Sequence, residues 1–154
     1  MENKQFKKTF GEVAKNHGFE SAFGGWFKES AECIVALELM KSNFGNYYQL
    51  NVKIFIQGIF GRKYTKNKDL IKREVGNISR GEPKEYEIFF DLDRPMEDTN
   101  RQKGIETLFH DFLVPFAQSV ASRDGVKELE RIGKIHIPLA VKEELGLIKI
   151  QANN

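Results

Sequence analysis

The feature that most constrains the fold is a stretch of strict alternation that begins at Tyr48. One set of side chains is large and apolar: Tyr48, Leu50, Val52, Ile54 and Ile56. The intervening set is largely polar: Gln49, Asn51, Lys53, Phe55 and Gln57. Because successive side chains of a β-strand point to opposite faces of the sheet, this period of two predicts a half-buried strand.

A second alternating stretch precedes the first and is joined to it by a turn. Its faces are formed by Cys33, Val35, Leu37 and Leu39 on one side and by Ile34, Ala36, Glu38 and Met40 on the other. Residues 42–46 have the composition of a turn, because glycine tolerates positive φ and asparagine bonds to its own backbone. The two stretches therefore predict an antiparallel hairpin. Matching their aliphatic faces pairs residues whose numbers sum to about 89, with Leu50 opposite Leu39 and Ile56 opposite Cys33.

Residues around the hairpin predict further strands and a cover on both faces of the sheet. A third strand is expected at Trp26–Ser30, and Ile78 suits a short strand. Ile34, Met40 and Phe55 make the second face of the hairpin partly apolar. We therefore expect both faces to be covered in part.

A long amphipathic helix is expected from about Thr99 to Ala121. Its apolar stripe contains Ile105, Leu108, Phe109, Phe112, Leu113, Phe116 and Val120. We expect four of these to be mostly buried: Phe109, Phe112, Leu113 and Phe116. Pro115 lies inside the stripe and predicts a kink or two abutting helices, because it lacks a backbone donor. Thr99 and Gln102 match a capping box at the helix start.

The other expected helices are shorter. Residues 3–17 carry an apolar stripe of Phe6, Phe10, Val13 and Ala14, with Gly18 in place to end the helix. A short helix is expected around Lys68–Arg73, another from an Asp124 cap to about Ile132, and a last one between Pro138 and Gly146. Residues 147–154 suit a short strand. Residues 82–98 predict an acidic connection that is held to the body by Phe89, Phe90 and Leu92.

These elements predict an α+β fold in which an antiparallel sheet, centred on a hairpin at residues 32–60, is covered by the N-terminal helix and the long C-terminal helix. The 154 residues suit a single domain, 1–154, and the formal net charge of +2 gives no overall electrostatic signature. No apolar signal region opens the chain, and no run approaches the roughly 20 apolar residues of a membrane span. We therefore expect a soluble, cytoplasmic protein.

The N-terminal two-fifths of the chain resembles a known family. The resemblance is carried by Gly18-Phe19, Trp26-Phe27, Leu39-Met40-Lys41-Ser42, Tyr48 and Leu50-Asn51-Val52. This combination is similar to a bacterial family that is catalogued as domain of unknown function 4304. Members often carry Gln-Lys-Ser where this chain has Met40-Lys41-Ser42, so no role of that glutamine carries over. The family has no established activity, and the resemblance therefore implies no catalytic residues.

Few residues suggest catalytic chemistry. His110 and Glu106 form an i, i+4 pair, which is the spacing of a two-ligand metal site or a general base with its orienting group, although such pairs are usually solvated. His17 follows a helix C-terminus, where the helix dipole favours an imidazolium. Cys33 is the only cysteine, so an intrachain disulfide and a Cys-based zinc site are excluded, and its place mid-strand indicates a small hydrophobe. We expect no catalytic residue, metal or cofactor.

Two further motifs are weak. The run Gly58-Ile59-Phe60-Gly61 follows a strand, which favours a bulge or tight bend over a phosphate-binding or RNA-binding loop. The pair Asp91 and Asp93 lacks the additional oxygen ligands and the glycine of a calcium loop.

Charge is segregated in the middle of the chain. Residues 61–80 contain seven Lys or Arg and two acids, whereas residues 81–98 contain seven acids and two bases. The two segments either fold against one another or stay solvated, or the basic one is an electrostatic docking surface. In the docking interpretation the contact residues lie in the glycine-punctuated stretch 61–81 and are Arg62, Lys63, Lys66, Lys68, Lys72 and Arg73.

The sequence thus favours a small soluble bacterial binding protein, such as an inhibitor or an immunity-type partner of another protein. A partner with an acidic surface is favoured over nucleic acid, because the adjacent acidic run would repel phosphates. The alternative is an enzyme with an unrecognised active site. A deep pocket with convergent polar groups would favour the enzyme.

Overall fold

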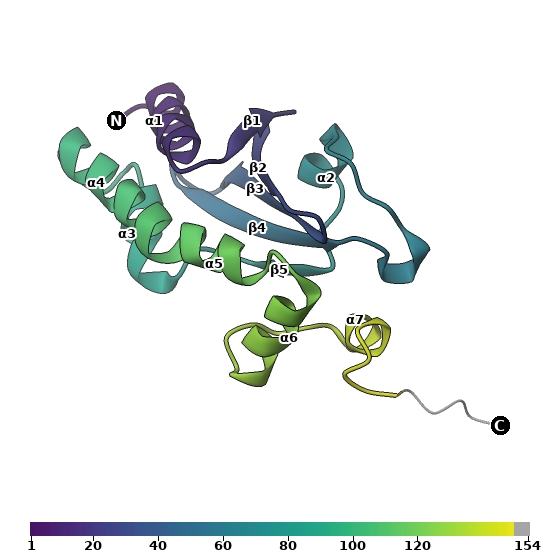
Figure 1. The fold of residues 1–154 in the computed structure, drawn as a ribbon. Coiled ribbons are helices and arrows are strands. Elements are labelled where there is room, and N and C mark those ends of the chain that lie inside the picture. The colour runs from purple at the N-terminus through teal and green to yellow at the C-terminus, as the bar shows by residue number, and fades with distance from the viewer. Residues whose placement is uncertain (150–154) are drawn as a thin grey trace.

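A computed structural model describes residues 1–149 and shows an α+β fold built on a five-stranded antiparallel sheet (Figure 1). The strands are β1 (Glu20–Ala22), β2 (Gly25–Glu29), β3 (Cys33–Lys41), β4 (Tyr48–Ile56) and β5 (Ile78–Arg80). They lie in the sheet in the same order as in the chain. The predicted third strand and the short strand at Ile78 are therefore confirmed as β2 and β5.

The hairpin of β3 and β4 has the register that the aliphatic pattern predicts. Cys33 faces Ile56, Val35 faces Ile54 and Leu39 faces Leu50, so the paired numbers sum to 89 throughout. A slip by one residue would turn every aliphatic side chain of one strand away from the core, which is why the pattern determines the register.

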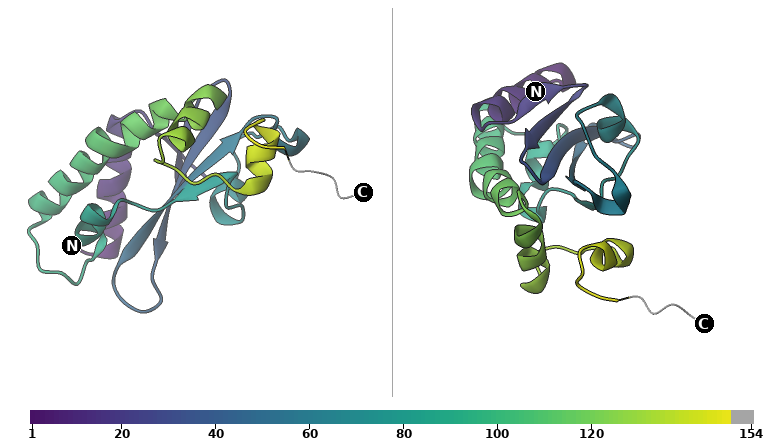
Figure 2. Two further views of the ribbon diagram at one scale, coloured as in Figure 1. Left: turned by 90° about the horizontal axis from the view of Figure 1, so that it is seen from below. Right: turned by 45° about the vertical axis from the view of Figure 1, so that its right-hand side comes forward.

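Helices lie against one face of the sheet (Figure 2). These are α1 (Asn3–Asn16) and the long helix, which consists of α4 (Asp98–Leu108), a π-helical segment (Phe109–Leu113) and α5 (Val114–Ser119). Shorter helices are α3 (Glu87–Phe90), α6 (Arg123–Arg131) and α7 (Leu139–Glu144). None of the helices described within residues 1–149 has both the length and the apolar composition that crossing a bilayer requires.

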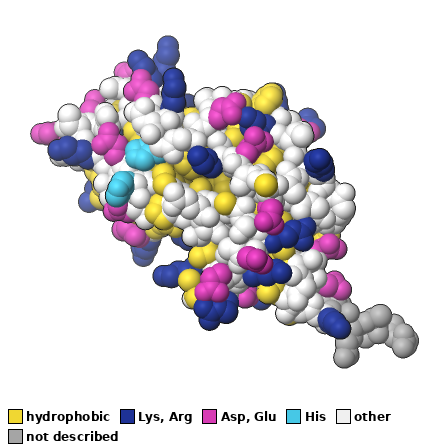
Figure 3. Space-filling view, in the orientation of Figure 1, with side chains coloured by type: hydrophobic (Ala, Val, Ile, Leu, Met, Phe, Trp, Pro, Cys, Tyr) yellow, Lys and Arg dark blue, Asp and Glu magenta, His cyan; other side chains and the backbone are white. Residues whose placement is uncertain are grey.

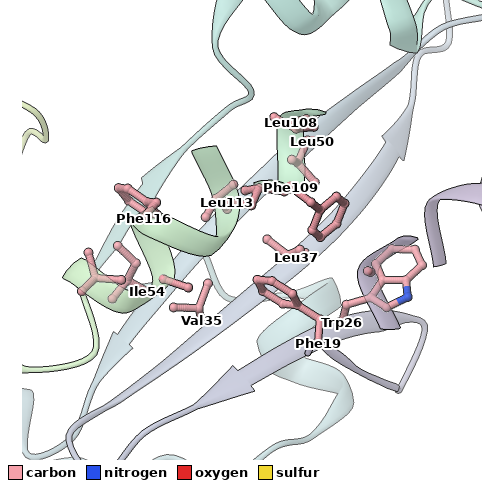
Figure 4. Packing of buried hydrophobic residues seen from close by; sticks show 14 of the residues in the cluster. Phe19, Trp26, Val35, Leu37, Leu50, Ile54, Leu108, Phe109, Leu113 and Phe116 are labelled. Carbon is pink, nitrogen blue, oxygen red and sulfur yellow. The ribbon is translucent and has the colours of Figure 1, made fainter. Parts of the chain in front are cut away.

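The larger core lies between that face and the long helix (Figure 4). Leu37 and Leu50 from the sheet meet Leu108 and Phe109 from the helix, and all four are buried. Phe109 lies against Phe10 of α1, with ring centroids 5.2 Å apart. The expected cover of the sheet by the N-terminal and long C-terminal helices is confirmed.

A smaller core lies on the opposite face, where α2 (Lys68–Lys72) packs. It contains Phe27, Ile34, Ala36, Phe55, Tyr64, Leu70 and Ile71. A Cβ on Gly25 would lie only 2.4 Å from Cδ1 of Ile71, so only glycine lets α2 approach the sheet this closely. Ile34 and Phe55 on the second face of the hairpin are thus explained, whereas Met40 lies outside this core and is exposed.

Pro115 is accommodated by the π-helical segment. The long helix runs from Asp98 to Ser119, and its five π-helical residues end just before Val114 and Pro115. Proline has no N–H and its ring crowds the carbonyl one turn earlier, so a local widening of the helix relieves the conflict. The widening also changes which residues face the sheet. Phe109, Leu113 and Phe116 are buried as expected, and Phe112 packs against the same core but is covered less completely.

Several predicted helix starts differ from those observed. The long helix begins at Asp98 after Glu97, without a side-chain cap, so Thr99 and Gln102 form no capping box. The cap of α6 is Ser122, whose Oγ accepts a hydrogen bond from the N–H of Gly125, and not Asp124. Residues 147–149 form no strand, and the rest of the expected C-terminal strand lies outside the described residues.

The acidic connection is held by a buried guanidinium that the sequence pattern does not reveal. Phe90 and Leu92 are buried as expected, and Phe89 is partly buried. Arg101 of α4 is 1% exposed and donates hydrogen bonds to the carbonyls of Phe89 (3.0 Å), Asp91 (2.9 Å) and Arg94 (3.0 Å). Bonds from a charged donor to a loop backbone are strong, and they fix this segment against α4.

Candidate functional site

The basic segment, residues 61–81, is positioned by α2 on the second face of the sheet. The Asn67 side chain caps this helix by accepting hydrogen bonds from the N–H groups of Asp69 (2.8 Å) and Leu70 (3.2 Å). This is the capping chemistry that asparagine favours. Leu70 and Ile71 anchor the helix in the smaller core, so the lysines and arginines around them face outward. The predicted short helix around Lys68–Arg73 is confirmed.

A buried ammonium fastens the end of α2 to the sheet. Lys53 of β4 is 3% exposed, and its Nζ donates to the carbonyls of Ile71 (2.6 Å) and Leu70 (3.3 Å). The same Nζ lies 3.1 Å from the carboxylate of Glu38, which is itself 9% exposed. Lysine near a helix C-terminus satisfies its last carbonyls and favours the helix dipole. The basic segment therefore rests on a fixed support.

The structure brings the six predicted contact residues to this side of the molecule, and acids accompany four of them. Arg62 pairs with Glu74 through two hydrogen bonds, Lys66 with Glu20, Arg73 with Asp69, and Lys72 lies 3.9 Å from Glu38. Lys63 and Lys68 are exposed and are not among the ion pairs of the described residues.

The partners of the six candidate residues differ from those that the charge pattern suggests. The acids come from β1, β3 and the basic segment itself, whereas the pattern offered residues 82–98 as the partner. Hydrogen bonding to Glu74 raises the pKa of Arg62, and hydrogen bonding to Glu20 raises the pKa of Lys66. Arg62 is exposed and Lys66 is half-buried, and ion pairs at a protein surface stabilise a fold only weakly. Most of the free positive charge of this surface therefore belongs to Lys63 and Lys68.

An open groove lies beside these cations. We call it the Phe60 groove; it has a volume of about 340 Å³ and is lined by Phe55, Phe60, Arg62, Tyr64, Arg73, Glu74, Val75, Gly76 and Asn77. Phe60 is 51% exposed and Val75 is 71% exposed, so two apolar side chains lie at the surface beside the charged residues of the groove. The Arg62 guanidinium lies over the Tyr64 ring, 4.6 Å from its centroid.

The backbone at Phe60 adopts a conformation that phenylalanine rarely takes. After Ile56 the chain turns through a 3₁₀ helix, Ile59–Gly61, in which Phe60 has φ +54°. Gly58 and Gly61 flank it with φ +86° and +72°. The tight bend that the two glycines predict is confirmed. Phe60 and Val75 were not singled out from the sequence, because nothing in a period or motif shows that an apolar side chain will be left exposed.

The other candidates for chemistry have structural partners. His110 Nδ1 bonds to Asp111 at 2.7 Å, while Glu106 accepts from Gln102 at 3.1 Å, so the expected His110–Glu106 pair is not formed. His17 caps α1, and its Nδ1 donates to the carbonyl of Val13 at 2.8 Å. Asp91 and Asp93 accept backbone N–H groups. Among residues 1–149, no group of three or more His, Cys, Asp or Glu could hold a metal ion.

Cys33 is 1% exposed, and burial raises the pKa of its thiol to about 12. The thiolate, which is the nucleophilic form of cysteine, is therefore scarce at neutral pH. This geometry agrees with the prediction of a small hydrophobe.

Comparisons with known proteins give one match. No curated protein and no solved structure matches the chain. A family model described as a domain of unknown function (DUF4304) matches residues 10–119. That range includes the whole sheet, the basic segment, the Phe60 groove and the long helix through Ser119. The match extends well beyond the N-terminal motifs of the sequence resemblance, and the chain belongs to the DUF4304 family of domains of unknown function.

Proposed function

We propose that this protein acts by binding another protein, and that the Phe60 groove with the surrounding basic residues is its contact surface. The observation that carries the proposal is Phe60 itself, an aromatic side chain that is half exposed and held at positive φ. Strained backbone of this kind is concentrated at functional sites.

Folding alone does not account for the residue. A left-handed conformation costs a residue with a Cβ roughly 1–2 kcal/mol, and glycine avoids that cost. Gly58 and Gly61 occupy the same region of conformational space on either side. The core gains little in return, because only about half of the Phe60 side chain is covered. A phenylalanine at this position is explained if its exposed ring binds a partner.

The surroundings define the kind of partner. Protein interfaces are enriched in aromatic residues and arginine, with the strongest contacts near the centre and charges at the rim. Phe60 and Val75 form the apolar centre here, Arg62 and Arg73 flank it, and Lys63 lies next to Arg62. We propose a partner whose surface has an apolar projection surrounded by acids. Glu20, Asp69 and Glu74 on the same side of this protein disfavour the phosphates of nucleic acid.

The role that we propose is that of an inhibitor or an immunity-type protein in the bacterial cytoplasm. Such a role needs a rigid recognition surface and no chemistry. The anchoring of α2 by Lys53 and by the smaller core supports the required rigidity.

The decisive variant is Phe60→Gly. Glycine suits the observed φ, so the free energy of unfolding should stay within about 1 kcal/mol of the native value. Affinity for the partner should fall tenfold or more, because the central aromatic contact is lost. The partner is first captured from native cell extract and identified by mass spectrometry, and its dissociation constant is then measured by calorimetry with both purified proteins.

Phe44→Ser is the matched control. Phe44 is 95% exposed and lies in the turn between β3 and β4, at the far end of these strands from Phe60. Its replacement should leave the affinity unchanged. In the same assay, replacing Lys63 and Lys68 with serine should slow association and weaken its salt dependence. A partner that binds the Phe60→Gly variant with native affinity would remove the groove from the interface.

A further inference from the structure

A separate cleft lies on the opposite face of the sheet from α2. We call it the α5 cleft; it has a volume of about 390 Å³ and is lined by His17, Lys28, Glu29, Ser30, Cys33, Val35, Val114, Ala117, Gln118 and Ala121. In Figure 3, hydrophobic side chains come to the surface in the middle of this side of the molecule, beside histidine side chains. Its volume is at the lower end of the range for ligand pockets, about 300–1,000 Å³, so it suits a small ligand.

The cleft exists because α5 presents small side chains to the sheet. Ala117 of α5 and Ala121, two residues beyond the end of that helix, both line the cleft together with Val35 and Cys33 of β3. The hydroxyl of Ser30 lies 2.6 Å from the carbonyl of Ala121 and ties the end of this helix to the β2–β3 connection. The π-helical segment, Phe109–Leu113, immediately precedes the wall of the cleft. Such segments occur frequently at functional sites.

One end of the cleft is basic. Lys28 Nζ lies 3.4 Å from the carbonyl of Gly18, and His17 is the residue before that glycine. Because a carbonyl only accepts, the 2.8 Å bond to Val13 requires the proton on Nδ1 of His17 and leaves Nε2 available to a ligand. The imidazole is further held by the Phe109 ring, 5.6 Å away. Both basic groups are thus held at the end of α1.

The one acidic residue that lines the cleft, Glu29, directs its carboxylate to the α2 side of the sheet. Side chains alternate along β2, so Lys28 and Glu29 lie on opposite faces of the sheet. The Glu29 carboxylate lies 3.8 Å from Lys66, which belongs to the basic segment on the α2 side. The charged group left at the cleft is therefore the ammonium of Lys28, and the amide of Gln118 adds hydrogen-bonding capacity from the α5 side.

The nucleophilic groups of the cleft are not available for chemistry. Burial raises the pKa of the Cys33 thiol to about 12, and the Ser30 hydroxyl is engaged by backbone carbonyls. The arrangement suits a ligand that is held and not transformed.

We propose that the α5 cleft binds a small carboxylic acid with an unbranched apolar body. Its carboxylate accepts a charge-assisted hydrogen bond from the ammonium of Lys28, at the end of the cleft beside Gly18. Its hydrocarbon chain lies along Val35, Val114 and Ala117 and is removed from water there. This site is independent of the Phe60 groove, because the two lie on opposite faces of the sheet.

The test uses octanoate as the probe and octanol as its uncharged counterpart. Calorimetric titration of the full chain should show saturable binding of octanoate, and binding of octanol at least tenfold weaker. Amide chemical shifts should change with octanoate at Val114, Ala117 and Gln118 before they change elsewhere. Octanol that binds as tightly as octanoate, or shifts confined to other regions, would overturn the proposal.

Substitutions test whether Lys28 contacts the carboxylate of octanoate. Lys28→Met keeps the apolar stem and removes the ammonium, so octanoate affinity should fall at least tenfold while octanol binding is retained. Lys41→Met, at the exposed end of β3, is the matched control and should bind octanoate like the native protein. Phe60→Gly should also bind octanoate normally, which separates this proposal from that of the Phe60 groove. Native octanoate affinity in Lys28→Met contradicts the inference. A peptide with a C-terminal leucine that binds more tightly than octanoate also contradicts the inference, because the cleft would then recognise the C-terminus of a polypeptide.

Discussion

Phe109 and Phe112 belong to one apolar stripe in the sequence, yet only Phe109 is a core residue. Phe109 is fully buried between α1 and the sheet. Phe112 stacks on Phe116, with centroids 5.3 Å apart, and carries the guanidinium of Arg80 on its ring at 4.4 Å. A stripe drawn at 3.6 residues per turn assumes regular α geometry. The π-helical segment alters that geometry at these residues. Pro115 is the only local sequence feature that indicates such a segment.

Phe109→Ala should therefore be far more damaging than Phe112→Ala. We expect a loss of about 3–5 kcal/mol for Phe109, because a large cavity forms in a packed core. Phe112→Ala should cost about 1 kcal/mol, because the ring is already partly exposed and loses one cation–π contact with the half-buried Arg80. Denaturant unfolding followed by circular dichroism measures both. Equal losses would show that the two rings share the core.

Glu82 is a half-buried carboxylate that supports the backbone of β4. Its Oε2 accepts the N–H of Leu50 at 2.9 Å, on the stretch of β4 that extends beyond the pairing with β5. Burial raises the pKa of this carboxyl from its ordinary value. An acid whose pKa is raised by folding stabilises the protein while protonated, and that contribution is lost as the pH rises through the folded-state pKa.

Glu82→Gln should accordingly raise the free energy of unfolding at pH 7. The amide oxygen keeps the hydrogen bond to Leu50, and the charge that burial penalises is gone. The gain should shrink as the pH is lowered into the range where the carboxyl of the native protein is itself protonated. Thermal unfolding of both proteins between pH 3 and pH 7 provides the comparison, and a difference that does not depend on pH would rule out this account.

Among the elements of the fold, α2 depends strongly on one side chain, that of Lys53. The helix has only five residues, too few to be stable alone, and it depends on Lys53 and the smaller core. The hairpin register places Lys53 and Glu38 on the same face, and this much follows from the sequence. The burial of Lys53 does not, because its other partners are backbone carbonyls seventeen and eighteen residues away.

Lys53→Met should loosen α2 before the rest of the sheet. Two carbonyls lose their donor and Glu38 loses the nearer of its two cations, and breaking a buried pair typically costs about 3–5 kcal/mol. Hydrogen exchange should show the loss first at the amides of α2, with β3 and β4 less affected. Lys63→Met, an exposed change in the same segment, should stay within about 0.5 kcal/mol of the native protein. Unchanged protection of α2 would mean that the smaller core alone holds the helix.

For the whole molecule, sequence periodicity predicts the regular elements of the fold but not the features of its surface. Periodicity determines the hairpin, its register and the covering helices, because each depends on burying one face of a regular element. The surfaces are different. Phe60 and the small residues Ala117 and Ala121 matter through contacts between distant segments, and the ion partners of Arg62 and Lys66 lie at Glu74 and on β1. Of these surface features, the sequence alone predicts only where the lysines and arginines lie in the chain.

The order of the strands has a consequence during synthesis. β1 to β4 are neighbours in sequence as well as in the sheet, so this part can form as soon as Ile56 has left the ribosome. The long helix that covers its apolar face ends only at Ser119. At roughly 5–20 residues per second, the part of that face that α1 does not cover stays exposed for on the order of 3–13 seconds. Nascent chains of this protein should therefore be clients of the chaperones that shield exposed sheet surfaces at the ribosome exit.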